Sequence, residues 1–324
     1  MHLSDALLST PVALTGVVVA VGLLATAGKE IKEKQNSSII PLMGVLGAFI
    51  FAAQMINFAI PGTGSSGHII GGVLLAAFLG PWAAFVTLAS VLIIQCLVFA
   101  DGGLLALGCN LINMGAMTAL VAYPLVYRPI VRKSTNPWVI TAGSLLACIV
   151  GLELGACLVT LETMLSDVSA LPWQRFLSIM TLIHLPIGAV EGLATALVLV
   201  FVARTRPDLL NHEESRPSKK SVGRAAIWFG LATLVIAGGI VWFASSNPDG
   251  LEWSIARVSG AEEIAQEHPT LVSVWAGKVA NATSIMPDYD NPLSGIAGAV
   301  IVLLIVWILS SLLLKRHKPQ HAED

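Results

Sequence analysis

Nine long apolar segments dominate this chain of 324 residues and decide what kind of structure it can form. Few charges interrupt them, because only 12% of the chain is Asp, Glu, Lys or Arg, against about a quarter in soluble domains. A bilayer core of about 30 Å is crossed by a helix of about 20 such residues. The sequence therefore predicts an all-α, multi-pass bundle of about nine transmembrane helices in the cell (inner) membrane. The segments are 11–28, 39–58, 68–80, 82–99, 104–127, 137–164, 175–203, 225–245 and 293–314.

The distribution of Lys and Arg predicts the orientation of these helices. If all nine segments cross the membrane, with a break at Gly80-Pro81, fifteen of the eighteen Lys and Arg fall on one side. Basic loops stay in the cytoplasm, so the amino terminus is expected outside and the carboxyl terminus in the cytoplasm. A single helix over 68–99 would separate the first three lysines from the others, although 13 residues are short for a crossing of their own.

A polar, proline-containing stretch divides the chain into two modules. We expect a membrane domain over residues 1–205, a cytoplasmic linker over 206–224 and a two-helix module over 225–324. The outer loop of the second module, residues 246–292, is acidic on balance.

The first two residues, Met1 and His2, form a chelating unit if the amino terminus is free. The Met1 amine, the His2 amide nitrogen and the His2 Nδ1 atom can close a five-membered and a six-membered ring around one divalent ion. No cleavable signal peptide is recognisable, so we expect Met1 to be retained. His68, in the stretch GTGSSGH (62–68), lies on the same predicted outer face at the start of its helix and offers a fourth nitrogen. Such an all-nitrogen set suits Ni(II), Co(II) or Cu(II).

Several polar residues near these positions have two explanations at this point. Gln54 and Asn57 form one pair on a helix face, and Asn110 and Asn113 form another. Hydrogen bonding between helices accounts for them, and so does a role in orienting a ligating imidazole. Ser65 and Ser66, next to His68 in the glycine-rich stretch, are further candidates for the orienting role.

Three ionisable residues, Glu153, His184 and Glu191, fall inside predicted helices, where they are costly and face the bundle interior. A polar contact between helices is one explanation and an ion relay is another. They also define the rival class of function, an intramembrane redox protein or enzyme. The sequence has no recognisable catalytic motif and no Walker motif, so we expect neither catalysis nor an ATP site in this chain.

Motifs in a fixed order resemble the CbiM/NikM family, the substrate-capture components of energy-coupling factor transporters for cobalt and nickel. The resemblance covers about residues 1–205, and SNPDGLEWS (246–254) resembles the PDGLE domain, which is similar in role to CbiN/NikN. Two residues depart from the usual MHIPDG start, namely Ser4 in place of proline and Ala6 in place of glycine. The shared motifs are MHLSDALLS (1–9), AQMINF (53–58), GTGSSGHIIGG (62–72), LGPW (79–82), FADGGLLALGCNLINMG (99–115) and HLPIGAVEG (184–192).

The resemblance implies a function in metal uptake and a set of partners. The ion, Ni2+ or Co2+, would be the transported substrate, held by Met1, His2 and His68. The chain would work in the lipid bilayer with a transmembrane coupling protein (the T component) and two cytoplasmic ATPases, and not with nucleic acid. Nickel and cobalt remain open alternatives, with planar amidate coordination leaning slightly toward nickel.

Overall fold

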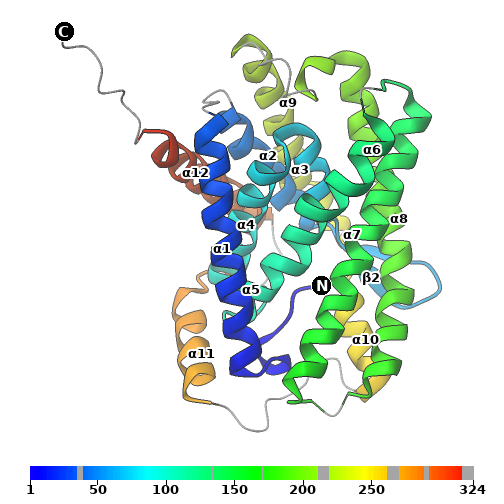
Figure 1. Ribbon diagram of the computed structural model, residues 1–324, viewed down its shortest axis with the longest axis vertical. Helices are drawn as coiled ribbons and strands as arrows, with labels where there is room; N and C mark the ends of the chain where they lie inside the picture. Colours follow the sequence, from blue (N-terminus) through cyan, green and yellow to red (C-terminus); the bar gives the residue numbers. More distant parts are fainter. Residues whose placement is uncertain are drawn as a thin grey trace.

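The computed structural model describes residues 1–34, 39–132, 134–169, 171–210, 219–260, 270–287 and 292–315. Helices form nearly all of the regular structure in these ranges, which confirms the all-α prediction (Figure 1). The one sheet described is a short antiparallel hairpin of β1 (Phe58–Ile60) and β2 (Ser65–Gly67). The helices of the first module are η1 (Asp5–Leu7), α1 (Thr10–Lys34), α2 (Ile39–Gln54), α3 (Gly72–Leu79), α4 (Pro81–Phe99), α5 (Leu107–Asn110), η2 (Leu111–Tyr127), α6 (Arg128–Val131), α7 (Pro137–Ser166), α8 (Trp173–Thr205) and η3 (Pro207–Leu209). The second module contributes α9 (Lys219–Gly238), η4 (Ile240–Phe243), α10 (Gly250–Ser259), α11 (Leu271–Thr283) and α12 (Pro292–Lys315).

Six helices in the described residues are long and apolar enough to cross a membrane: α1, α4, the continuous helix Leu107–Val131, α7, α8 and α9. Two shorter apolar helices, Ile39–Gln54 and Leu293–Ile308, accompany them. The segment predicted over 68–80 is helical only from Gly72, and the eight residues of α3 are about 12 Å long, too short to cross alone. The chain is thus a multi-pass membrane protein, and nine crossings stay a prediction.

The break that the sequence predicts at Gly80-Pro81 is present. Gly80 has φ +78°, a conformation that strongly favours glycine, and Pro81 begins α4 directly after it. The backbone therefore ends α3 and begins a separate helix at this point.

Glycines allow α7 and α8 to pack closely along their length. Gly188 and Gly192 of α8 lie against the backbone of Ile149 and Leu145 of α7, where an added Cβ would approach Cα atoms to 2.9 and 2.6 Å. This spacing of two small residues four apart is typical of close helix pairs in membranes.

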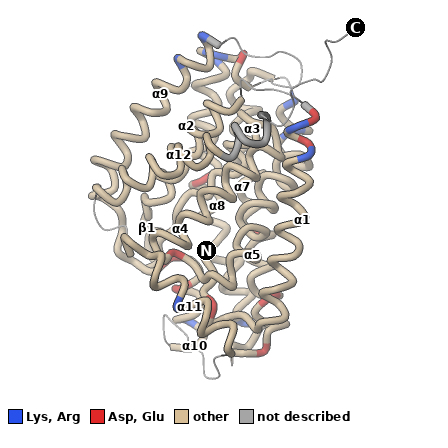
Figure 2. Tube along the Cα trace, turned by 90° about the vertical axis from the view of Figure 1, so that its left-hand side faces the viewer, with Lys and Arg blue, Asp and Glu red and all other residues tan. Residues whose placement is uncertain are grey.

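The two modules pack together, and the amino terminus lies inside the bundle. Helices α9 and α12 of the second module pack on α2. The N label lies among the helices rather than at an end (Figure 1), and Met1 is 4% exposed. Lys and Arg gather at the end where α9 begins, and α10 and α11 lie at the opposite end (Figure 2).

Candidate metal site

The amino-terminal segment is held in the bundle through the backbone of Leu3. Its N–H donates to Asn110 Oδ1 at 2.8 Å, and its carbonyl accepts from Asn110 Nδ2 at 3.2 Å and from the Gly103 N–H at 2.8 Å. The Leu3 side chain is fully buried. Asn110, one of the predicted orienting residues, therefore fixes the residue next to His2.

Asp5 anchors the same segment one turn further along. Its Oδ1 atom accepts the backbone N–H groups of Leu105 and Ala106 at 2.9 and 3.0 Å, just before α5. Burial raises the pKa of the Asp5 carboxyl, and these N–H groups oppose that shift. The departures at Ser4 and Ala6 leave the segment directed into the bundle, with Ser4 extended at φ −85° and Ala6 inside η1.

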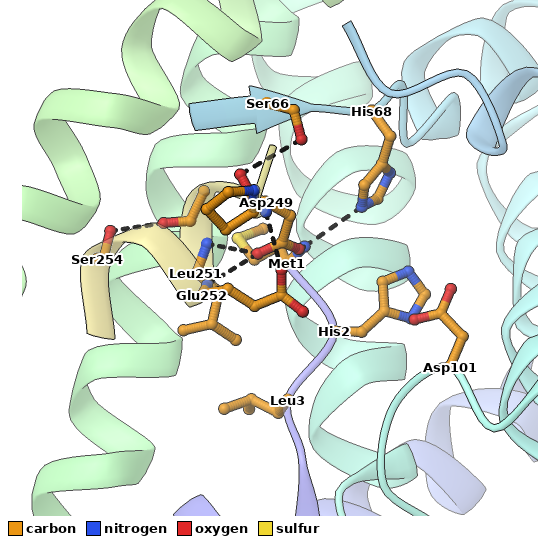
Figure 3. A network of polar contacts seen from close by, with 12 residues as sticks. Met1, His2, Leu3, Ser66, His68, Asp101, Asp249, Leu251, Glu252 and Ser254 are labelled. Carbon is orange, nitrogen blue, oxygen red and sulfur yellow. Dashed lines mark hydrogen bonds and ion pairs between the residues drawn. The ribbon is translucent and has the colours of Figure 1, made fainter. Parts of the chain in front are cut away.

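The three residues predicted to bind metal lie together. The Met1 amino nitrogen is 3.3 Å from His68 Nε2, although 67 residues separate them, and the centroids of the His2 and His68 rings are 5.3 Å apart (Figure 3). The His2 Nδ1 atom faces Asp101 Oδ1 at 3.3 Å. Burial lowers the pKa of the His2 imidazole, and Asp101 opposes this. A lowered pKa favours the neutral ring, the form that binds metal.

The segment after His68 is fixed from two helices. Both carboxyl oxygens of Glu191, in α8, accept backbone N–H groups, from Ile70 at 3.0 Å and from Gly71 at 2.9 Å. Gln54, in α2, donates through Nε2 to the Ile70 carbonyl at 2.9 Å. These contacts satisfy backbone groups that are not in a helix, as irregular structure inside a membrane protein requires. They also set the position of the His68 backbone.

A small cavity of about 10 Å³ lies beside the predicted ligands, with room for about one water-sized sphere. Its lining joins the first module, through α7, α8 and the His68 segment, to the second module. The lining residues are Met1, Gly67, His68, Ile70, Leu152, His184, Ile187, Asp249 and Gly250. His184 therefore shares a cavity with His68. The sequence predicts His184 inside a helix and His68 at the start of another helix on the outer face, and so gives no indication of this proximity.

The other predicted orienting residues have partners outside this cavity. Asn113 donates to Glu162 at 2.6 Å, and the Asn57 carbonyl accepts the Ser245 N–H at 2.7 Å. Ser65 and Ser66 bond to the backbone of the second module, the hydroxyl of Ser66 donating to the Asn247 carbonyl at 2.8 Å.

Glu153, His184 and Glu191, the ionisable residues of the rival interpretation, form no hydrogen bond with one another. The Nδ1 atom of His184 donates to the Met180 carbonyl of its own helix at 2.8 Å, and Glu191 binds the segment after His68. Glu153 Oε1 is buried without a hydrogen-bond partner among the described residues. Within the same residues, no three His, Cys, Asp or Glu side chains are grouped so that they could hold a metal ion. The predicted chelate is not a group of this kind, because two of its four nitrogens belong to the main chain.

The sequence did not single out the two acids that contact the predicted ligands. Asp101 faces His2, and Asp249 Oδ2 lies 2.5 Å from the Met1 amino nitrogen. Burial acts to raise the pKa of Asp249, but the Met1 ammonium, His68 and the hydrogen bonds that the carboxylate accepts together hold that pKa below its usual range. The two acids belong to the motifs FADGG and SNPDGLEWS. An acid in an apolar sequence, for Asp101, and an acid at the start of a helix, for Asp249, were the signals that could have identified them.

Comparison with known proteins places these features in a family. Residues 2–209 match the cobalt uptake substrate-specific transmembrane region, CbiM, and residues 223–315 match the PDGLE domain. The chain is 33% identical to a putative fused nickel transport protein NikMN of Archaeoglobus fulgidus, over 96% of this chain and 98% of that protein. It is 30% identical to the fused nickel transport protein NikMN of Rhodobacter capsulatus, over 95% and 86%.

A solved structure is similar to this chain over part of its length. The crystal structure of a truncated transition metal transporter is 31% identical, with a TM-score of 0.56 over 63% of this chain and 99% of that chain. These relatives are described as transporters rather than enzymes, which agrees with a multi-pass protein of the cell membrane. The chain therefore belongs to the CbiM family and carries a PDGLE domain in the same polypeptide.

Proposed function

We propose that this chain is the substrate-capture subunit of an energy-coupling factor uptake transporter for nickel or cobalt ions. It takes the ion from the extracytoplasmic side and works with a separate transmembrane coupling protein and two cytoplasmic ATPases. The names of the fused relatives and of the family support the substrate class. The sequence has no nucleotide-binding motif, which supports an external energy source.

The observation that carries this proposal is the short distance of 3.3 Å between the Met1 amino nitrogen and His68 Nε2 inside the bundle. The ion would be held by the Met1 amine, the amide and imidazole of His2, and the His68 imidazole. The His2 ring would exchange its contact with Asp101 for the ion. Because the amine and the amide must lose protons to bind, metal uptake would release protons.

The topology that we propose rests on the distribution of charges. We propose nine crossings with the amino terminus outside, a membrane domain over 1–205, a cytoplasmic linker over 206–224 and a two-helix module over 225–324. Lys and Arg gather at one end of the bundle (Figure 2), which supports the cytoplasmic assignment of that end. Much of the linker, and Glu262, Glu263, Glu267, Asp288 and Asp290 of the acidic loop, lie outside the described residues.

Nickel is the ion that we favour of the two. The nearly planar arrangement expected for an amine, an amidate and imidazoles suits Ni(II), and the fused relatives are named for nickel. The rival enzyme or redox function is not favoured. Glu191 accepts hydrogen bonds from the backbone after His68, and His184 donates to the Met180 carbonyl, so neither is hydrogen-bonded to the other or to Glu153.

Titration of the purified protein in detergent with Ni2+ and with Co2+ tests the proposal. We expect tight binding by the unmodified chain and its loss in His68→Ala and in a chain extended by two residues before Met1. His212→Ala, which changes a histidine of the polar linker, is the control and should bind like the parent. Unchanged affinity in the extended chain or in His68→Ala would refute the ligand set.

A further inference from the structure

We propose that Asp249 of the PDGLE domain is a positioning residue for metal capture, which holds the Met1 amino group beside His68. The second module would then complete a site whose metal ligands all come from the first module. This inference rests on the proposed function of Met1, His2 and His68 as the ligands.

The first support is the docking of the second module on the loop that carries His68. The Ser66 N–H and hydroxyl donate to the Pro248 and Asn247 carbonyls, both at 2.8 Å. In the turn of the hairpin, the Thr63 carbonyl accepts the Trp253 indole N–H at 3.0 Å. Asp249 lies between these anchors in the sequence, so its backbone is held beside the His68 loop on both sides.

The second support is the way in which the Asp249 carboxylate divides its two oxygens. Oδ1 accepts the backbone N–H groups of Leu251 and Glu252 at 2.8 and 2.9 Å and caps the start of α10. Glu252 returns the contact by accepting the Asp249 N–H at 2.9 Å, which completes a capping box. Because the helix fixes Oδ1, Oδ2 is presented to the Met1 amine at 2.5 Å in an orientation that does not depend on Met1.

The third support is the chemistry of the amine. A primary amine that binds a metal keeps two N–H groups, so the same carboxylate oxygen can accept from it before and after the ion binds. Asp249 and Met1 have side-chain exposures of 18% and 3%, so a charge at this place needs a partner. A fixed carboxylate supplies one for the ammonium, and equally for a divalent ion bound by an amidate. Partners of this outer kind orient metal ligands, and their loss costs about 10- to 100-fold in affinity.

Asp249→Asn is the test variant. Asparagine is also a good helix cap through its Oδ1 atom, so α10 should be retained. The NH2 group that replaces Oδ2 is an uncharged donor and cannot accept a hydrogen bond from the Met1 amine. We expect Ni2+ and Co2+ affinity to fall about 10- to 100-fold. Glu252→Gln is the matched control, because it removes one negative charge from the same capping box without touching Met1, and it should change affinity less than threefold.

Two further measurements separate positioning from a general loss of structure. At saturating Ni2+, the d–d absorption band of Asp249→Asn should move to lower energy as the amine is displaced, whereas a merely destabilised protein would keep the parent band. In a chain extended before Met1, whose tight binding is already lost, Asp249→Asn should cause no further loss of Ni2+ affinity, because the Met1 nitrogen is then part of a peptide bond.

The outcomes also distinguish the two proposals. If the parent binds metal and His68→Ala does not, while Asp249→Asn has parent affinity and spectrum, the role of Asp249 is overturned and the ligand set stands. An equal loss of affinity in Glu252→Gln and Asp249→Asn would also overturn it, in favour of a general effect of charge. Parent-like binding by His68→Ala would refute the proposed function itself.

Discussion

Replacing Glu191 by glutamine should weaken metal binding although Glu191 itself touches none of the proposed ligands. Its two carboxyl oxygens each accept one buried backbone N–H, from Ile70 and Gly71, in the segment that follows His68. Glutamine keeps one oxygen and turns an NH2 group toward the other N–H. One buried donor is then left without an acceptor, which costs about 1–3 kcal/mol.

The magnitude of the binding defect follows from that cost. Gln54 still holds the Ile70 carbonyl at 2.9 Å, so the segment stays attached on one side and changes conformation locally. If the whole cost appears in the position of His68, the dissociation constant for Ni2+ rises about 5- to 150-fold. The assay is calorimetric titration of Ni2+ into purified protein, with thermal unfolding measured in parallel without metal.

Glu153→Gln is the matched control for this prediction. Glu153 is also an acid of a membrane helix, but its Oε1 atom has no hydrogen-bond partner among the described residues. We expect its affinity for Ni2+ to remain within about threefold of the parent. Parent affinity in Glu191→Gln, together with an unchanged unfolding temperature, would refute the reasoning that this carboxyl positions His68.

Two other substitutions test the backbone on either side of the site. Asn110→Ala removes the acceptor of the buried Leu3 N–H, which costs about 1–3 kcal/mol. We expect this cost to appear as weaker Ni2+ binding in the same titration. Unchanged binding would contradict a role for Asn110 in fixing the amino-terminal segment. Gly71→Ala places a Cβ 2.4 Å from Ile50 Cδ1 at φ +82°, whereas Gly62→Ala meets only the strain of φ +76° in open space. Thermal unfolding should therefore show Gly71→Ala to be the less stable of the two, and equal stabilities would argue against the close packing of Gly71.

Hydropathy was sufficient to predict the class of fold, but not the length of every helix. The segment 68–80 is as apolar as its neighbours, yet its first four residues are not helical. Glu191 and Gln54, from α8 and α2, satisfy the backbone groups of Ile70 that a helix would otherwise have paired internally. An apolar segment whose backbone is satisfied by distant side chains cannot be distinguished from a helix by composition alone.

The candidate ligands could be proposed from the sequence because their chemistry is local. Met1 and His2 are adjacent, so the amine, amide and imidazole form a chelating unit whatever the rest of the fold. The grouping with His68 needed only the expectation that both lie on the outer face. The role of Glu191 was not predictable in this way, because 121 residues separate it from Ile70 and its partners are backbone N–H groups, which every segment possesses.

The Met1 amine and the capping pattern at Asp249 are both visible in the sequence. An ammonium group that enters a bundle of low dielectric needs a negative partner close by, so burying Met1 implies a carboxylate at the same place. The acidic loop of the second module offers several carboxylates, but only an acid held rigidly is suited to one fixed position. The pattern Asp249-x-x-Glu252 is the sequence signature of a capping box, in which the helix start fixes the first acid. Two local rules together therefore identify a contact between residues 248 positions apart, which neither rule reveals alone.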